Sequence, residues 1–323
     1  MGKLVKQLRE QTGCPIQQCK QALQESNMDL EAAKEYLKEK GLSRAQKYQT
    51  KETREGLVGL RISEDSKNAA MLELNCQTDF VARTESFLNY SSAFLNSLLK
   101  ENKGKQGFEY TQAGNEQEIS EYLKNHSLNE QIIPQADASA SISETHQYLI
   151  SHLQENINLR RFSFLAANQG IFGAYCHNSI SSGLGQKQCL VELELENDKN
   201  LNEEQIKKIR KLADDIALQI LGNKPEYLKK SDIPEEILEK EREIVKTSFG
   251  DKLEGKPEKV QKNMVEGKMK KFYEDRVLMS QSFIFDDADE GDARSMEQYI
   301  KEIEKSIGTK INIKQFQNWS CEQ

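Results

Sequence analysis

The stretch LNCQTDFVARTESF, residues 74–87, marks the place where one periodicity in the sequence gives way to another. Before it, GLVGLRIS (56–63) and AAMLELN (69–75) alternate in the manner of β-strands, and the turn-like EDSKN separates them. After it, large apolar residues recur at spacings of three and four, as on one face of a helix. The sequence therefore predicts an antiparallel β-hairpin followed directly by an α-helix.

Thr78, Asp79 and Phe80 stand at the corner between this strand and this helix. Phe80 is a large apolar residue in a polar stretch, beside an acid that has no obvious partner. In one interpretation, the ring packs under its own helix while Thr78 or Asp79 caps that helix. In the other, the ring is held out for the apolar pocket of a partner, and Asp79 reaches the partner's cations or backbone donors. The residues alone leave both open.

The pattern of hairpin and helix recurs further along the chain. GIFGAYCH (170–177) and CLVELELEN (189–197) predict a second hairpin, joined by the Gly- and Ser-containing connection 178–188, and a helix follows over 202–221. Two related α+β halves are one explanation, and two unrelated hairpins are the other.

Residues 1–41 predict three short helices. Ile16, Cys19 and Leu23 lie three and four apart and are expected to share one face of the second helix. Asp29 is placed to cap the third helix, and Gly41 to end it. A polar linker, partly helical in one interpretation, follows at 42–55.

Half of the residues in 229–278 are charged, and only a narrow apolar stripe runs through them. Ile237, Ile244 and Val245 are expected on the first helix of this segment, and the second carries Val260, Met264, Met269 and Phe272. Such a stripe favours an antiparallel helical hairpin that projects into solvent. The alternative is a pair of solvated helices lying on the core.

The fold class expected from these patterns is α+β, with strands also at 282–285 and 311–316 around a helix at 296–307. The chain divides into a helical module (1–41), a linker (42–55), a first half (56–152) with a polar insertion at about 100–147, a second half (153–228), the helical hairpin (229–278) and a return to the core with a short C-terminal tail (279–323).

Composition and motifs exclude several classes of function. The net charge of −7 and the lack of a basic cluster argue against a nucleic-acid binder, and no apolar run is long enough for a membrane span. The six cysteines and four histidines show no metal-ligand spacing, so we expect reduced thiols and no metal. No phosphate loop and no nucleophile–base pair is present, and SSGLGQK (181–187) joins two strands instead of opening a helix. Binding to another protein remains.

The sequence NCQTDFVAR (75–83) resembles the signature of the elongation factor Ts family. LREQTGCPIQQCKQAL (8–23), ENINLRR (155–161), AYCH (174–177), KPEYL (224–228) and MVEGKMKKF (264–272) follow in that family's order. The resemblance covers nearly the whole chain. It implies a ubiquitin-associated-like (UBA-like) three-helix module, a two-part α+β core with antiparallel sheets, and a projecting antiparallel coiled-coil hairpin.

The resemblance also implies a function, which is nucleotide exchange on elongation factor Tu without bond chemistry. Asp79 and Phe80, between Thr78 and Val81, would disturb the magnesium ion and hence the GDP held by the partner. This chain would need no cofactor of its own. We expect a bacterial cytoplasmic protein, or alternatively a mitochondrial or plastid one, in a 1:1 complex or a dimer of complexes, with no membrane and no direct nucleic-acid partner.

Further contact residues are implied by the same resemblance. Ile16 and Lys20 match the N-terminal contact face, Leu153 and Gln154 a helix end that supports the core contact, and His177 a histidine on the second half. His177 as a packed strand residue is the alternative. A UBA-containing adaptor without exchange activity is the rival function, but it leaves the Asp79-Phe80 corner unexplained.

Overall fold

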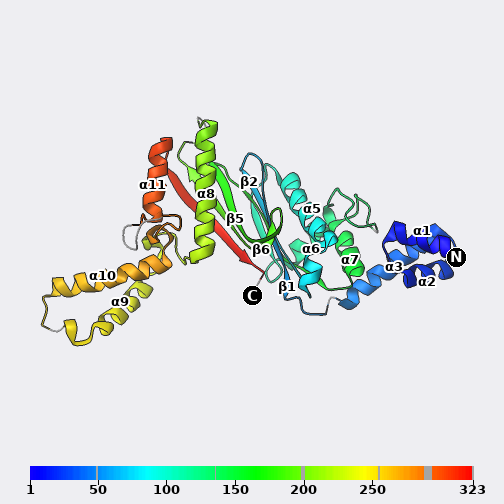
Figure 1. Cartoon of the computed structure of the whole chain (residues 1–323), viewed down its shortest axis with the longest axis horizontal. Helices are drawn as coiled ribbons and strands as arrows, with labels where there is room; N and C mark the ends of the chain where they lie inside the picture. Colours follow the sequence, from blue (N-terminus) through cyan, green and yellow to red (C-terminus); the bar gives the residue numbers. More distant parts are fainter. Residues whose placement is uncertain (49, 135, 198–200, 254, 287–292, 322–323) are drawn as a thin grey trace. The chain divides into compact units, whose positions relative to one another are not determined.

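The computed structural model describes residues 1–48, 50–134, 136–197, 201–253, 255–286 and 293–321. The chain forms two compact units (Figure 1). Unit 1 comprises Met1–Asn168, Cys176–Gln188 and Trp319–Gln323, and unit 2 comprises Gln169–Tyr175 and Cys189–Asn318. The fold is α+β, as predicted.

Three helices begin unit 1, namely α1 (Gly2–Thr12), α2 (Ile16–Glu25) and α3 (Leu30–Tyr48). Leu8, Cys19 and Leu23 are buried between them, and the carboxylate of Asp29 accepts the Ala32 N–H at 2.9 Å, as a cap should. Ile16, three residues before Cys19, is not buried with them. Its side chain is 54% exposed.

The predicted helix end at Gly41 is wrong, since α3 continues to Tyr48. Gly41 lies against α7 (Ile142–Leu153), where an added Cβ would stand 3.1 Å from the hydroxyl of Ser151. Ala45, one turn further, is buried in the core of unit 1. The glycine therefore serves close helix packing, and burial of Ala45 extends the helix past it.

The first hairpin forms as predicted. Strand β1 (Glu55–Ile62) pairs antiparallel with β2 (Asn68–Cys76), and α5 (Glu85–Asn102) packs on both. Strand β4 (Ile157–Ala166) pairs with the other edge of β2, and β3 (Phe108–Thr111) pairs with β4. The polar insertion also carries α6 (Glu116–Asn125), whose Ile119 and Tyr122 are buried, so this segment contributes to the core.

A register shift between β2 and β4 surrounds a buried acid. Glu73 lies opposite Arg161 and Leu74 opposite Leu159, so Arg160 is the extra residue of a β-bulge. The Glu73 carboxylate accepts from Arg161 Nε at 2.6 Å and Arg160 Nη1 at 3.3 Å. The bulge thus brings two consecutive guanidinium groups to one fully buried carboxylate.

The second hairpin consists of β5 (Gly170–Ser181) and β6 (Leu184–Leu195). The predicted connection 178–188 is therefore mostly strand, with the turn at Ser182-Gly183, and the tip of β6 pairs with β1. The strand order is β3-β4-β2-β1-β6-β5, and β7 (Ile311–Ser320) pairs with β6. Unit 2 also holds α8 (Glu203–Asn223) and α11 (Met296–Ile307), as predicted.

The predicted strand at 282–285 is wrong. Only Ser282 forms an isolated bridge, with Ser295. Phe283 is buried and stacks on Tyr299 of α11, with 4.0 Å between the ring centroids. The segment is thus held by packing on a helix and not by pairing with a strand.

The two halves share details that favour related units over unrelated hairpins. Gly56 and Gly170 have φ of 143° and 140°, and a Cβ on either would overlap a carbonyl oxygen of the paired strand, that of Leu74 or Leu193. One residue before each of those leucines stands a buried acid, Glu73 in β2 and Glu192 in β6. Glu192 accepts from Lys314 Nζ at 2.7 Å and from Gln315 Nε2 at 2.6 Å, both on β7.

Helices α9 (Glu235–Phe249) and α10 (Glu258–Arg276) lie side by side (Figure 1). Leu238 and Val245, seven residues apart, pack with Val265, Met269 and Phe272 of α10, which follow at spacings of four and three. Ile244 and Val260, predicted for the same stripe, are instead exposed, because they fall beside these spacings.

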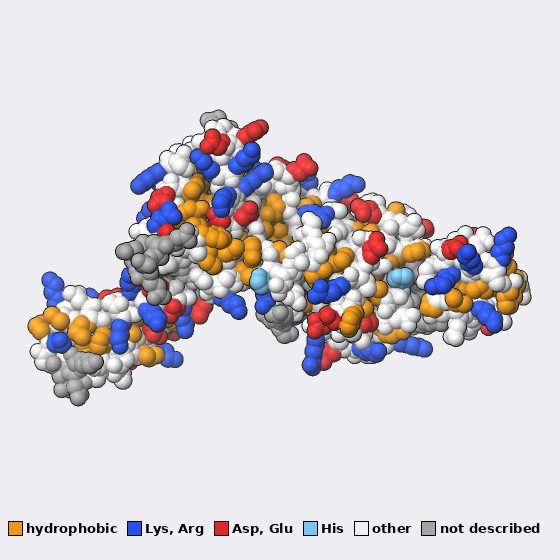
Figure 2. Space-filling view, in the orientation of Figure 1, with side chains coloured by type: hydrophobic (Ala, Val, Ile, Leu, Met, Phe, Trp, Pro, Cys, Tyr) orange, Lys and Arg blue, Asp and Glu red, His pale blue; other side chains and the backbone are white. Residues whose placement is uncertain are grey.

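The surface carries charges of both signs. On the face drawn in Figure 2, Lys and Arg side chains are intermixed with Asp and Glu side chains. Within the described ranges, no helix combines the length and the apolar character that crossing a membrane requires.

We predict that Gly56→Ala lowers the free energy of unfolding by about 3 kcal/mol or more, because the new methyl group would overlap the Leu74 carbonyl. Gly104→Ala is the matched control: its φ is also positive, at 80°, but no atom lies within 4 Å of the added Cβ. There the loss should be about 1 kcal/mol. Denaturant unfolding measures both. Equal losses would mean that the close strand approach is unimportant.

Candidate functional site

The corner between β2 and α5 contains a single helical turn, α4 (Asp79–Ala82). Thr78 precedes it in an extended conformation, and its hydroxyl accepts the Val81 N–H at 3.4 Å. Val81 and Ala82 are buried in the core of unit 1, whereas Asp79 and Phe80 face outward. Within this one turn, Val81 and Ala82 anchor the chain in the core, and Asp79 and Phe80 are presented to solvent.

Phe80 is 80% exposed, the highest value among the large hydrophobic side chains that the structure describes as exposed. The interpretation in which its ring packs under the helix is therefore wrong; Thr78 caps the short α4, and Thr84 caps the long α5. Unit 1 buries other phenylalanines completely, among them Phe87 and Phe94. An exposed ring held on a capped turn is suited to filling a partner's pocket.

Thr78 is held by groups from two directions. The Glu155 carboxylate accepts the Thr78 N–H at 3.1 Å and the Thr78 hydroxyl at 2.8 Å. The Cys76 thiol donates to the Thr78 carbonyl at 3.1 Å. Burial, together with the nearby Glu155 carboxylate, raises the pKa of Cys76 to about 12, so this thiol stays protonated and able to donate.

Glu155 was not among the predicted site residues. It lies far from Thr78 in sequence, and no local pattern joins the two. The register of β2 on β4 could have found it, because Cys76 pairs with Ile157 and each of the two interacting residues lies two positions beyond that pair.

Leu153 and Gln154 end α7 directly before Glu155. Gln154 is exposed and has a left-handed conformation, with its N–H donated to the Ile150 carbonyl at 2.9 Å. Leu153 is half-buried against the core. The bonds from Glu155 to Thr78 therefore bring this helix end to the Asp79-Phe80 corner, although sequence spacing does not.

The other predicted contact residues lie on separate elements. Ile16 and Lys20 are exposed on α2 and line a groove of about 470 Å³ together with residues of α1, including Val5 and Arg9. His177 is exposed on β5. The alternative in which His177 is a packed strand residue is therefore wrong.

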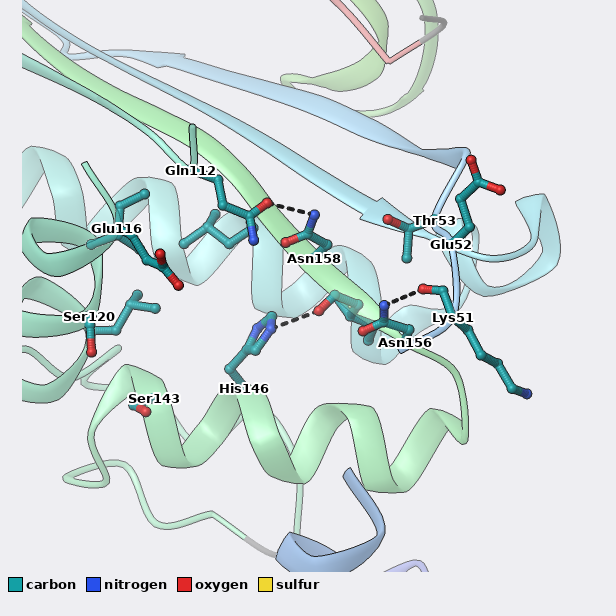
Figure 3. A pocket seen from close by; sticks show the side chains of 14 residues that line it. Lys51, Glu52, Thr53, Gln112, Glu116, Ser120, Ser143, His146, Asn156 and Asn158 are labelled. Carbon is teal, nitrogen blue, oxygen red and sulfur yellow. Dashed lines mark hydrogen bonds between the residues drawn. The ribbon is translucent and has the colours of Figure 1, made fainter. Parts of the chain in front are cut away.

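A polar pocket of about 640 Å³ lies among α6, α7, the start of β4 and residues 51–53 (Figure 3). His146 projects into it, but both ring nitrogens are engaged: Nε2 donates to the Ile157 carbonyl at 3.0 Å, and Nδ1 accepts from the Tyr90 hydroxyl at 3.1 Å. Burial lowers the pKa of His146 to about 4. The imidazole is a structural link here, because it has no free nitrogen for a substrate.

Metal chemistry also lacks a site in the part of the chain that the structure describes. No three His, Cys, Asp or Glu side chains gather there in a way that could hold an ion.

Comparisons with known proteins agree along nearly the whole chain. Residues 77–322 match the family model described as Elongation factor TS, and residues 3–36 match that of a UBA-like domain. Elongation factor Ts of Aquifex aeolicus (strain VF5) is 36% identical over 314 residues, which cover 97% of this chain and 94% of that protein. Elongation factor Ts of Clostridium novyi (strain NT) is 34% identical, with 97% and 90% covered.

We predict that Phe80→Ala changes the free energy of unfolding by less than about 1 kcal/mol, because the exposed ring contributes little to its own fold. Phe94→Ala, which truncates a buried ring in the same unit, should cost about 3–5 kcal/mol. Chemical denaturation of the two variants gives the comparison. A large loss for Phe80→Ala would place its ring in the core.

We predict a pH dependence of stability from His146. Its pKa is lower in the folded state than the 6.5 of an unfolded histidine, so the unfolded chain binds the extra proton first as pH falls. The stabilisation is complete above pH 6.5 and is lost towards pH 4, by about 3 kcal/mol in total. His146→Gln should remove this part of the slope, and His177→Gln, at an exposed site, should keep it. Identical slopes for all three proteins would contradict the assignment.

Proposed function

The chain belongs to the elongation factor Ts family, a family of nucleotide exchange factors, and we propose that it binds elongation factor Tu in its GDP form and speeds GDP release. No bond is made or broken in this process. The observation that carries the site assignment is the exposed Phe80 ring beside Asp79, on a turn whose capping residue, Thr78, is held by Glu155.

The mechanism we propose is linkage. An exchange factor accelerates release when it binds the nucleotide-free partner more tightly than the GDP-bound partner. By reciprocity, bound GDP lowers the partner's affinity for the exchange factor by the same ratio. Phe80 supplies contact area near the partner's nucleotide site, and Asp79 supplies charge and hydrogen-bond acceptors. Together they would displace structure that holds the partner's magnesium ion, so both GDP and metal belong to the partner.

The remaining surfaces hold the complex together in this proposal. Ile16 and Lys20 contact the partner from the N-terminal module, and Leu153 and Gln154 flank the Asp79-Phe80 corner. His177 makes a second contact from the β5–β6 hairpin. Helices α9 and α10 form a coiled-coil hairpin, which the seven-residue spacing of Leu238 and Val245 supports. The setting is the bacterial cytoplasm, as the bacterial relatives suggest. Light scattering would separate a 1:1 complex from a dimer of complexes.

We predict that the purified chain accelerates release of fluorescent GDP from elongation factor Tu, and that Phe80→Ala slows catalysed release by about tenfold or more. Asp79→Ala should slow it less, because an exposed acid keeps water as an alternative partner. Phe285→Ala is the matched control: it removes a 53% exposed ring from unit 2 and should leave release unchanged. Binding of the partner without faster release would favour an adaptor over an exchange factor.

A further inference from the structure

The turn that presents Phe80 lacks an internal support that helix starts commonly have. In a capping box, the side chain at the third helical position reaches back to the N–H of the capping residue. The third residue of α4 is Val81, which is buried in the core and has no acceptor. The carboxylate that accepts the Thr78 N–H comes instead from Glu155, on the segment after α7.

Glu155 uses both carboxylate oxygens on the same residue. Oε2 accepts the Thr78 N–H and Oε1 accepts the Thr78 hydroxyl, whose oxygen in turn accepts from the Val81 N–H. This chain of bonds runs from the end of α7 into the first turn of α4. A single isolated turn is unstable by itself, so its geometry depends on such external anchors.

We propose that Glu155 is a positioning residue of the exchange site. It fixes the start of α4 so that Phe80 and Asp79 keep one orientation, and it holds that turn at a set place beside Leu153 and Gln154. The gain is pre-organisation, because a ring that is already oriented loses less conformational freedom when it enters the partner. This inference rests on the exchange function proposed above.

The test uses Glu155→Gln, which keeps the shape of the side chain but presents an NH₂ group in place of one acceptor. Glu121→Gln is the charge-matched control, since Glu121 is an exposed acid on α6 of the same unit.

The first measurement is amide hydrogen exchange in the free, full-length protein. The amides of Val81 and Ala82 should exchange about tenfold faster in Glu155→Gln than in the wild type or Glu121→Gln, while amides of the β2–β4 ladder keep their protection. Unchanged exchange at Val81 and Ala82 would overturn the proposal whatever the effect on activity.

The second measurement is GDP release from elongation factor Tu over a range of chain concentrations. Glu155→Gln should lower the maximal release rate by about tenfold, because fewer complexes hold the ring in place. In the Phe80→Ala background the same change should have little further effect, because the ring it positions is absent. Additive effects would show that Glu155 acts on the partner directly and would overturn the positioning role.

The wild-type chain separates this inference from the function beneath it. If the wild type does not accelerate GDP release, the exchange function fails, and the role of Glu155 fails with it. If the wild type is active and Glu155→Gln matches it at every concentration, only the positioning role is refuted.

Discussion

The ion pair between buried Glu73 and the guanidinium groups of Arg160 and Arg161 sets the geometry on which the first unit depends. A carboxylate without contact with water needs paired cations, and removing them would cost about 3–5 kcal/mol. The β-bulge satisfies that need by turning two consecutive arginines toward one acid. Arg161 also lies over the Trp319 ring at 4.4 Å, which ties the last strand into the same network. Beyond the bulge the register runs on to the Cys76–Ile157 pair, so Thr78 and Glu155 meet as a result.

Local patterns predicted the elements well, and distant contacts explain the exceptions. Both hairpins, the helices after them and the paired α9 and α10 follow from periodicities inside each segment. The sequence predicts a helix end at Gly41, but the glycine is there because α7 packs closely against it. That helix lies more than a hundred residues away in the chain, so no local pattern shows the contact. The Gly- and Ser-containing segment 178–188 was read as a connection, although pairing with β1 makes part of it strand. Ile16 lies three residues before Cys19, and spacing alone does not show that only Cys19 of the two is buried.

The candidate site divides in the same way. The corner itself stood out in the sequence, because an aromatic residue beside an acid contradicts the polarity around it. The exposure of the Phe80 ring could not be derived from spacing, since the same sequence is compatible with a ring packed under the helix. Glu155 was beyond reach for a different reason: its role exists only through sheet register, which joins two segments with no shared pattern. Residues that act at one place in the chain were thus predictable, and residues that act across the sheet were not.

Phe80 is 80% exposed and is expected to contribute little to its own fold, in contrast to Gly56 and the buried acid Glu73 in the strands beside it. The close approach of the paired strand requires glycine at position 56, and full burial requires paired cations around Glu73. Both constraints arise inside the molecule. In the proposed exchange function, the ring at position 80 is constrained only by the surface of the partner. Its identity is therefore free to change in step with that surface, and a variant chain could acquire a new specificity at this one position without first having to become more stable.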